Sequence, residues 1–222
     1  MKEEVIKTLL EKSQTKQQVY DHTKVAFKKI KQILQDIVSD YNQDLIDADK
    51  RVLLEYRDRG VFESEIRIAG DLLIFNMHSN VFEFPSDHQI WKTRGGREDV
   101  LNTYAGIINI YNFLADSFKY NRSDDLGYLI GRLFINRNNY YFIEGRKEIG
   151  YTYPSFDDHE VSHEALKRVV EGTLLFALKF DLLVPPMDKI QVASVSQMKE
   201  RINKSKIQTG KRLGFNYETE EG

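Results

Sequence analysis

The sequence contains no cysteine among its 222 residues, which excludes disulfide bonds, thiolate zinc sites and cysteine nucleophiles. It also contains no uninterrupted run near the roughly 18 apolar residues that a membrane-spanning helix needs. The first residues, MKEEVIKTLLEKSQ, include acids and contain no apolar core followed by a small-residue cleavage site, so they do not form a signal peptide. We therefore expect a cytoplasmic protein with no membrane partner.

No charge of one sign dominates the sequence. The 32 Lys and Arg residues nearly balance the 34 Asp and Glu residues, and the formal net charge is −2. Such a chain has no global field that attracts nucleic acid, so nucleic acid is not favoured as a partner. Because 41% of the residues are hydrophobic, the chain is apolar enough to fold, and its length suits one compact domain with extensions.

Glycine and proline are both absent from Lys2 to about Asp47, where apolar residues recur with helical period. One uninterrupted helix would run for about 60 Å at about 1.5 Å per residue, more than a single domain can cover. Its exposed part would need a partner, most simply a second copy of the chain. The alternative is two ordinary helices packed on one sheet, with a break in the polar segment 13–18. We assign residues 1–48 to an N-terminal helical segment that is expected to form a homo-oligomer.

Strand patterns follow in the middle of the chain. Residues 62–68 alternate between apolar and charged side chains, which predicts a strand with one solvent-exposed face. Further strands are predicted over 52–56 and 72–84. Segment 100–118 fits either a helix or a strand, and its β-branched and aromatic residues favour a strand from Gly106 onward. Leu126 to Ile135 and Tyr140 to Ile143 flank an asparagine-rich turn and predict a hairpin.

These segments predict an α+β fold with an antiparallel sheet of about five or six strands built from hairpins. The sheet domain spans 49–185 and includes a helix over 157–180, which packs on the sheet together with the N-terminal helix. Residues 186–222 form a C-terminal extension with a weak helix and a charged tail. Sheets of this kind are similar, at the level of fold alone, to those of PAS and GAF sensor domains.

Two segments are candidates for ligand binding. Gly127 and Gly131 are expected to share one face of their strand, and the missing side chains would let a ligand, or a packed helix, come close. Arg94 and Arg97 flank two glycines in a predicted loop, where backbone amides and positive charge could bind an anion. A solvated loop is the alternative explanation of that segment.

One pentapeptide matches a known catalytic motif. His159-Glu160-Val161-Ser162-His163 matches H-E-x-x-H and resembles the zincin peptidases over those five residues. The resemblance implies zinc held by His159 and His163, with Glu160 as general base. Charged flanks depart from that family, and a helix start at Asp157, with an Asp157–Glu160 capping box, explains the same residues. We therefore expect no metal and no catalytic residue here, and retain the zinc-dependent hydrolase as the alternative.

A second alternative is a metal-dependent nuclease. Asp124 or Asp125, followed by Glu144 with Arg146 or Lys147, approximates the acid and E-x-K pattern that holds magnesium against a phosphate. The expected lysine position carries Arg146, so the motif is incomplete. The leading hypothesis is a non-catalytic binding or assembly module without a cofactor, whose partner is a protein or a small ligand and whose copies associate through residues 1–48.

Overall fold

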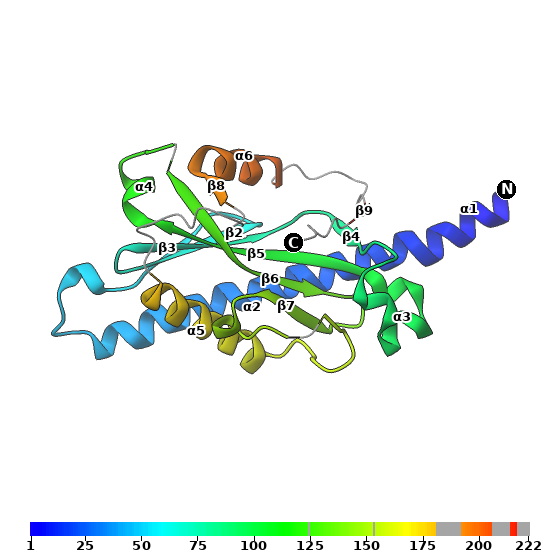
Figure 1. Cartoon of the computed structure of the whole chain (residues 1–222), viewed down its shortest axis with the longest axis horizontal. Coiled ribbons are helices and arrows are strands. Elements are labelled where there is room, and N and C mark those ends of the chain that lie inside the picture. The colour runs from blue at the N-terminus through cyan, green and yellow to red at the C-terminus, as the bar shows by residue number, and fades with distance from the viewer. Residues whose placement is uncertain (124, 153, 181–191, 206–213, 217–222) are drawn as a thin grey trace.

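The computed structural model describes residues 1–123, 125–152, 154–180, 192–205 and 214–216. It confirms the predicted α+β class, with a long N-terminal helix and a second helix on one face of an antiparallel sheet (Figure 1). The predicted boundary near residue 185 and the acidic end of the charged tail lie outside the described residues. Within those ranges, no helix is both long and apolar enough to cross a bilayer.

The N-terminal segment is one continuous helix, as the first of the two alternatives predicted. It comprises α1 (Lys2–Thr8), a π-helical turn (Leu9–Ser13) and α2 (Gln14–Asp44). From Thr15 onward α2 packs on the sheet through side chains that recur every three or four residues, whereas all residues before Thr15 are exposed. The first turns of the helix therefore project beyond the sheet (Figure 1).

The described part of the sheet is built mainly from antiparallel neighbours. Its central path follows six strands, namely β1 (Glu55–Asp58), β2 (Glu63–Ile68), β3 (Asp71–Met77), β5 (Tyr104–Leu114), β6 (Leu126–Ile135) and β7 (Tyr141–Gly145). Three short strands extend it: β4 (Val81–Glu83) pairs with β5, β8 (Val192–Ser194) pairs with β6, and β9 (Gly214–Asn216) runs parallel to β4. The strand predicted from Gly106 onward is confirmed as β5.

The two faces of the sheet carry separate hydrophobic clusters. The largest lies under α2 and α5 (His163–Lys179), where Phe27, Ile33 and Leu166 are almost fully buried. The other face carries one cluster around Phe84, and another beneath α6 (Val195–Ser205). Val195, Met198 and Ile202 of α6 are buried in that cluster. The weak helix predicted in the C-terminal extension is therefore packed against the sheet.

The strand predicted over 72–84 is broken in two. β3 ends at Met77 and β4 begins at Val81, because His78 closes a turn in which its Nδ1 accepts a hydrogen bond from the backbone N–H of Asn80 at 3.0 Å. The strand predicted over 52–56 lies slightly later, as β1. The solvent-exposed face predicted for 62–68 is wrong, because Glu63 and Glu65 retain only 5% and 4% exposure.

Burial lowers the pKa of His78, and the pKa of His88 falls for the same reason. The folded state therefore binds fewer protons than the unfolded state below the ordinary histidine pKa of about 6.5. We expect the free energy of unfolding to fall as the pH drops below about 6.5, by at most about 1.4 kcal/mol per pH unit for each histidine.

Urea titrations between pH 7 and pH 5 measure this dependence. His78→Asn keeps an acceptor for Asn80 but cannot be protonated, so this variant should lose stability less steeply. The same substitution at exposed His159 controls for the exchange itself. Identical pH slopes for wild type and His78→Asn would refute the role of His78.

Candidate functional site

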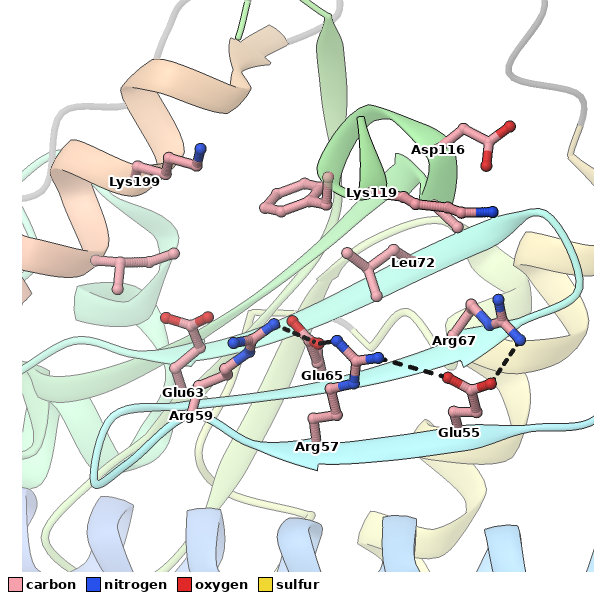
Figure 2. Close-up of a pocket in the computed structure, with 13 residues that line it drawn as sticks. Glu55, Arg57, Arg59, Glu63, Glu65, Arg67, Leu72, Asp116, Lys119 and Lys199 are labelled. Carbon is pink, nitrogen blue, oxygen red and sulfur yellow. Dashed lines mark hydrogen bonds and ion pairs between the residues drawn. The ribbon is translucent and has the colours of Figure 1, made fainter. Parts of the chain in front are cut away.

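A charged groove of about 720 Å³ lies on the face of β1 and β2 that is turned away from α2. One wall is the β1–β2 hairpin, and the other is made by α4 (Ala115–Lys119) and α6 (Figure 2). Three kinds of side chain line it: the cations Arg57, Arg59, Arg67, Lys119 and Lys199, the acids Glu55, Glu63, Glu65 and Asp116, and the apolar residues Leu72, Ala115, Phe118 and Ile202.

The hairpin wall follows from the alternation of charges in the sequence. Side chains alternate across a strand, so the charges of 55–59 and those of 63–67 point to the same face. The antiparallel register places Glu55 opposite Arg67 and Arg57 opposite Glu65. The next pair is set by the backbone N–H of Arg59, which donates to the carbonyl oxygen of Glu63 at 3.2 Å. Each charged side chain on this face of the hairpin therefore lies opposite a side chain of the other sign on the neighbouring strand.

These side chains form a continuous ladder of ion pairs. A nitrogen of Arg59 lies 2.8 Å from Glu65 Oε1, and Arg57 bridges Glu65 at 3.8 Å to Glu55 at 3.7 Å. Arg67 closes the ladder at 2.6 Å from Glu55 Oε1 (Figure 2). The hydrogen bond to Glu65 raises the pKa of the Arg59 guanidinium. The ladder thus holds two carboxylates between three guanidinium groups.

The opposite wall contributes lysines with a different environment. Lys199 of α6 donates a hydrogen bond to Asn121 Oδ1 at 2.6 Å, and the Lys119 ammonium lies 5.0 Å from the centre of the Tyr120 ring. Within the described parts of the chain, neither ammonium forms an ion pair with a carboxylate. The two walls thus differ in that each arginine is paired with a carboxylate and, among the described residues, the lysines are not.

The arginines predicted to bind an anion lie elsewhere. Arg94 and Arg97 belong to the short helix α3 (Arg94–Glu98) and not to a loop. The carboxylate of Asp157 accepts hydrogen bonds from the backbone N–H groups of Arg94 and Gly95, at 3.0 and 2.8 Å. The amides proposed for a ligand therefore already bind an anionic group that the chain itself supplies.

Gly127 and Gly131 do not share a face, contrary to the prediction. A β-bulge at Ile130 shifts the register, because Ile110 pairs with Gly131 whereas Tyr111 pairs with Leu129. A Cβ at Gly127 would lie 2.1 Å from the Phe113 ring, but one at Gly131 would lie 3.6 Å from Ile149 on the opposite face. Close aromatic packing explains Gly127 without a ligand.

The helix predicted to start at Asp157 begins only at His163. Ser162 is its N-cap and accepts a hydrogen bond from the backbone N–H of Ala165 at 3.1 Å. His159 and Glu160 lie before the helix, in an extended segment that pairs with the hairpin, where Tyr141 N–H donates to His159 O at 2.8 Å. The zinc-peptidase arrangement requires both histidines on successive turns of one helix. His159 and His163 do not meet this requirement, because only His163 lies in the helix. Among the described residues, no group of three or more His, Cys, Asp or Glu side chains is placed to hold a metal ion.

The acids of the nuclease alternative have other partners. Asp125 forms an ion pair with Arg122 at 2.9 Å and accepts a hydrogen bond from Ser117, while Glu144 lies 3.8 Å from Arg132. Arg146 lies over the ring of Phe176. Lys147 belongs to a separate 3-10 turn, and Asp124 is outside the described residues. The structure therefore does not bring the described members of this set, Asp125, Glu144, Arg146 and Lys147, into one site.

The sequence analysis missed the groove, although a signal for it exists. The alternation of opposite charges over 55–67 predicts a ladder once the hairpin is recognised. The second wall has no such signal, because α6 lies about 130 residues further along the chain. Comparison of the chain with models of known protein families, with curated proteins and with solved structures finds no match.

Proposed function

We propose that the protein is a non-catalytic binding and assembly module, which holds a small ligand in the charged groove and associates with a second copy through its N-terminal helix. The observation that carries the binding function is the groove itself, whose charged wall is fixed by the ladder from Arg59 to Arg67.

Size and rigidity both support a binding role for the groove. Its volume of about 720 Å³ falls in the range of roughly 300–1,000 Å³ typical of small-molecule sites. Because the ladder holds the arginines in place, a ligand would not have to order them. Such preorganisation favours affinity.

A thermal-shift panel of small anions, cations and neutral compounds tests this function. At a concentration of 100 times its Kd, a ligand adds about 2.7 kcal/mol to the free energy of unfolding. For a chain of this size, that should raise the Tm by roughly 5–10 °C. Ala115→Trp places a large side chain in the groove and should abolish the shift.

The matched control is Ala48→Trp, at a partly exposed alanine that does not line the groove, and this variant should retain the shift. If no compound of any charge class stabilises the wild-type protein, or if Ala115→Trp responds as Ala48→Trp does, the groove does not bind ligands as proposed.

The assembly function is supported by the projecting end of the helix. Val5, Ile6, Leu9 and Leu10 are between 46% and 62% exposed and are spaced so that 5 and 9, and 6 and 10, are neighbours on the helix. An isolated helical end of this length is marginally stable in water, because most helix stability comes from packing of an apolar face. The same segment of a second copy would cover these side chains.

A further inference from the structure

We infer that the groove binds a small organic anion whose apolar body lies on Leu72 and Ile202 and whose acidic group meets one of the two lysines, Lys119 or Lys199. This inference rests on the proposed binding function and assigns the chemical class of the ligand. The evidence is the distribution of donors, acceptors and apolar side chains among the lining residues.

The carboxylates of the ladder are poorly available to a cationic ligand. Glu65 is contacted by both Arg57 and Arg59, and Glu55 by both Arg57 and Arg67. Each guanidinium has five N–H donors. The three guanidinium groups together therefore offer more hydrogen bonds than two carboxylates can accept. The hairpin wall therefore retains donors and few free acceptors.

The acids outside these contacts do not reverse this balance. Glu63 is 5% exposed and therefore presents little surface to a ligand, and Asp116 is exposed at the outer edge of α4. The lining as a whole has five cationic and four acidic side chains, a formal excess of one positive charge.

The lysines are the cations that remain available. An ammonium has three donors, and the described partner of Lys199 is the neutral side-chain amide of Asn121 at 2.6 Å. A carboxylate, sulfonate or phosphate group would form charge-assisted hydrogen bonds with Lys119 or with Lys199, which are stronger than bonds between neutral groups.

Arg67 supplies an independent sign of a missing acceptor. Its terminal nitrogen bonds to Glu55, but its Nε is buried and has no hydrogen-bond partner in the described structure. An unsatisfied buried donor is costly, so the hairpin wall has more donors than acceptors and does not favour a cationic ligand.

Apolar side chains also line the groove. Leu72 lies between the hairpin wall and Lys119 in Figure 2, and Phe118 and Ile202 line the same groove. A fully hydrophilic ion would leave these residues against water or charge. A ligand that matches the whole lining therefore combines an acidic head with an apolar body.

Octanoate, octylammonium and octan-1-ol test the charge class, because they share one chain and differ in the head group. We expect octanoate to shift the ¹³C-methyl NMR signals of Leu72 and Ile202 in a saturable manner, and the other two probes to bind at least tenfold more weakly. Lys119→Gln combined with Lys199→Gln should weaken octanoate binding at least tenfold, since each lost charged hydrogen bond corresponds to that order of change.

The control pair is Lys28→Gln with Lys92→Gln, at exposed lysines that do not line the groove, and it should leave the affinity unchanged. Equal binding of the three probes, or equal affinity of the two lysine pairs, would overturn the anion assignment while leaving a binding groove in place. Absence of any methyl shift with octanoate would overturn it as well, and the thermal-shift panel then decides the binding function separately.

Discussion

Replacing Gly106 by valine is expected to lower the free energy of unfolding by about 3 kcal/mol or more, because overpacking a rigid core costs of that order. Gly106 is where β5 touches α2. A Cβ built there would lie 2.0 Å from Thr23 Oγ1 and 2.8 Å from Thr23 Cβ. Thr23 is fully buried and its hydroxyl donates to the carbonyl oxygen of Val19 at 2.7 Å, so it cannot move aside. Denaturation followed by circular dichroism measures the loss.

Gly70→Val is the matched control, because a Cβ at Gly70 meets no atom within 4 Å. It should change stability by no more than about 0.5 kcal/mol. Thr23→Ala removes Oγ1 and Cγ2, two of the three Thr23 atoms nearest the new side chain, so in the double variant the costs should be non-additive by about 1 kcal/mol or more. Similar losses for Gly106→Val and Gly70→Val would show that close contact does not determine the choice of glycine.

Deleting residues 1–13 is expected to convert a dimer into a monomer. Light scattering of the full chain should give twice the 26.0 kDa mass of one copy, and the truncated chain should give a mass near that of one copy. The physical reason is that the deletion removes Val5, Ile6, Leu9 and Leu10, while α2 begins to pack on the sheet only at Thr15. The fold should therefore survive the deletion.

Leu9→Glu with Leu10→Glu should have the same effect without shortening the helix. Val25→Glu is the control, because Val25 is 51% exposed on the same helix but lies within the part that covers the sheet. A full-length chain that is monomeric at all concentrations would refute the proposal, and so would a truncated chain that remains dimeric.

The helices and strands whose apolar residues recur with a clear period were predictable from the sequence. Which of two nearby capping residues starts a helix was not. Asp157 was assigned to the start of the helix that follows it. The structure instead uses its carboxylate on the backbone of Arg94 and Gly95, about 60 residues earlier, and Ser162 starts α5. Local sequence shows that an acid can cap a helix, but tertiary packing decides which helix.

The predictions of side-chain burial and of strand register were wrong for related reasons. The alternating pattern of 62–68 correctly placed Glu63 and Glu65 on one face, but it could not show that α6 and the arginine ladder cover that face. The bulge at Ile130 adds one residue without changing the local composition, so a strict alternation assigned Gly127 and Gly131 to the same side. Both errors concern contacts between segments far apart in the chain.

The position of β5 has a consequence for how the molecule unfolds. This strand contributes to all three hydrophobic clusters, through Ile108 beneath α2, Phe113 beneath α6 and Ile107 beside Phe84. Displacing it would expose all three at once, so no cluster can open through this strand without weakening the others. The amides of β5 should therefore exchange with deuterium only through global opening, and the domain should melt as one cooperative unit in place of three independent ones.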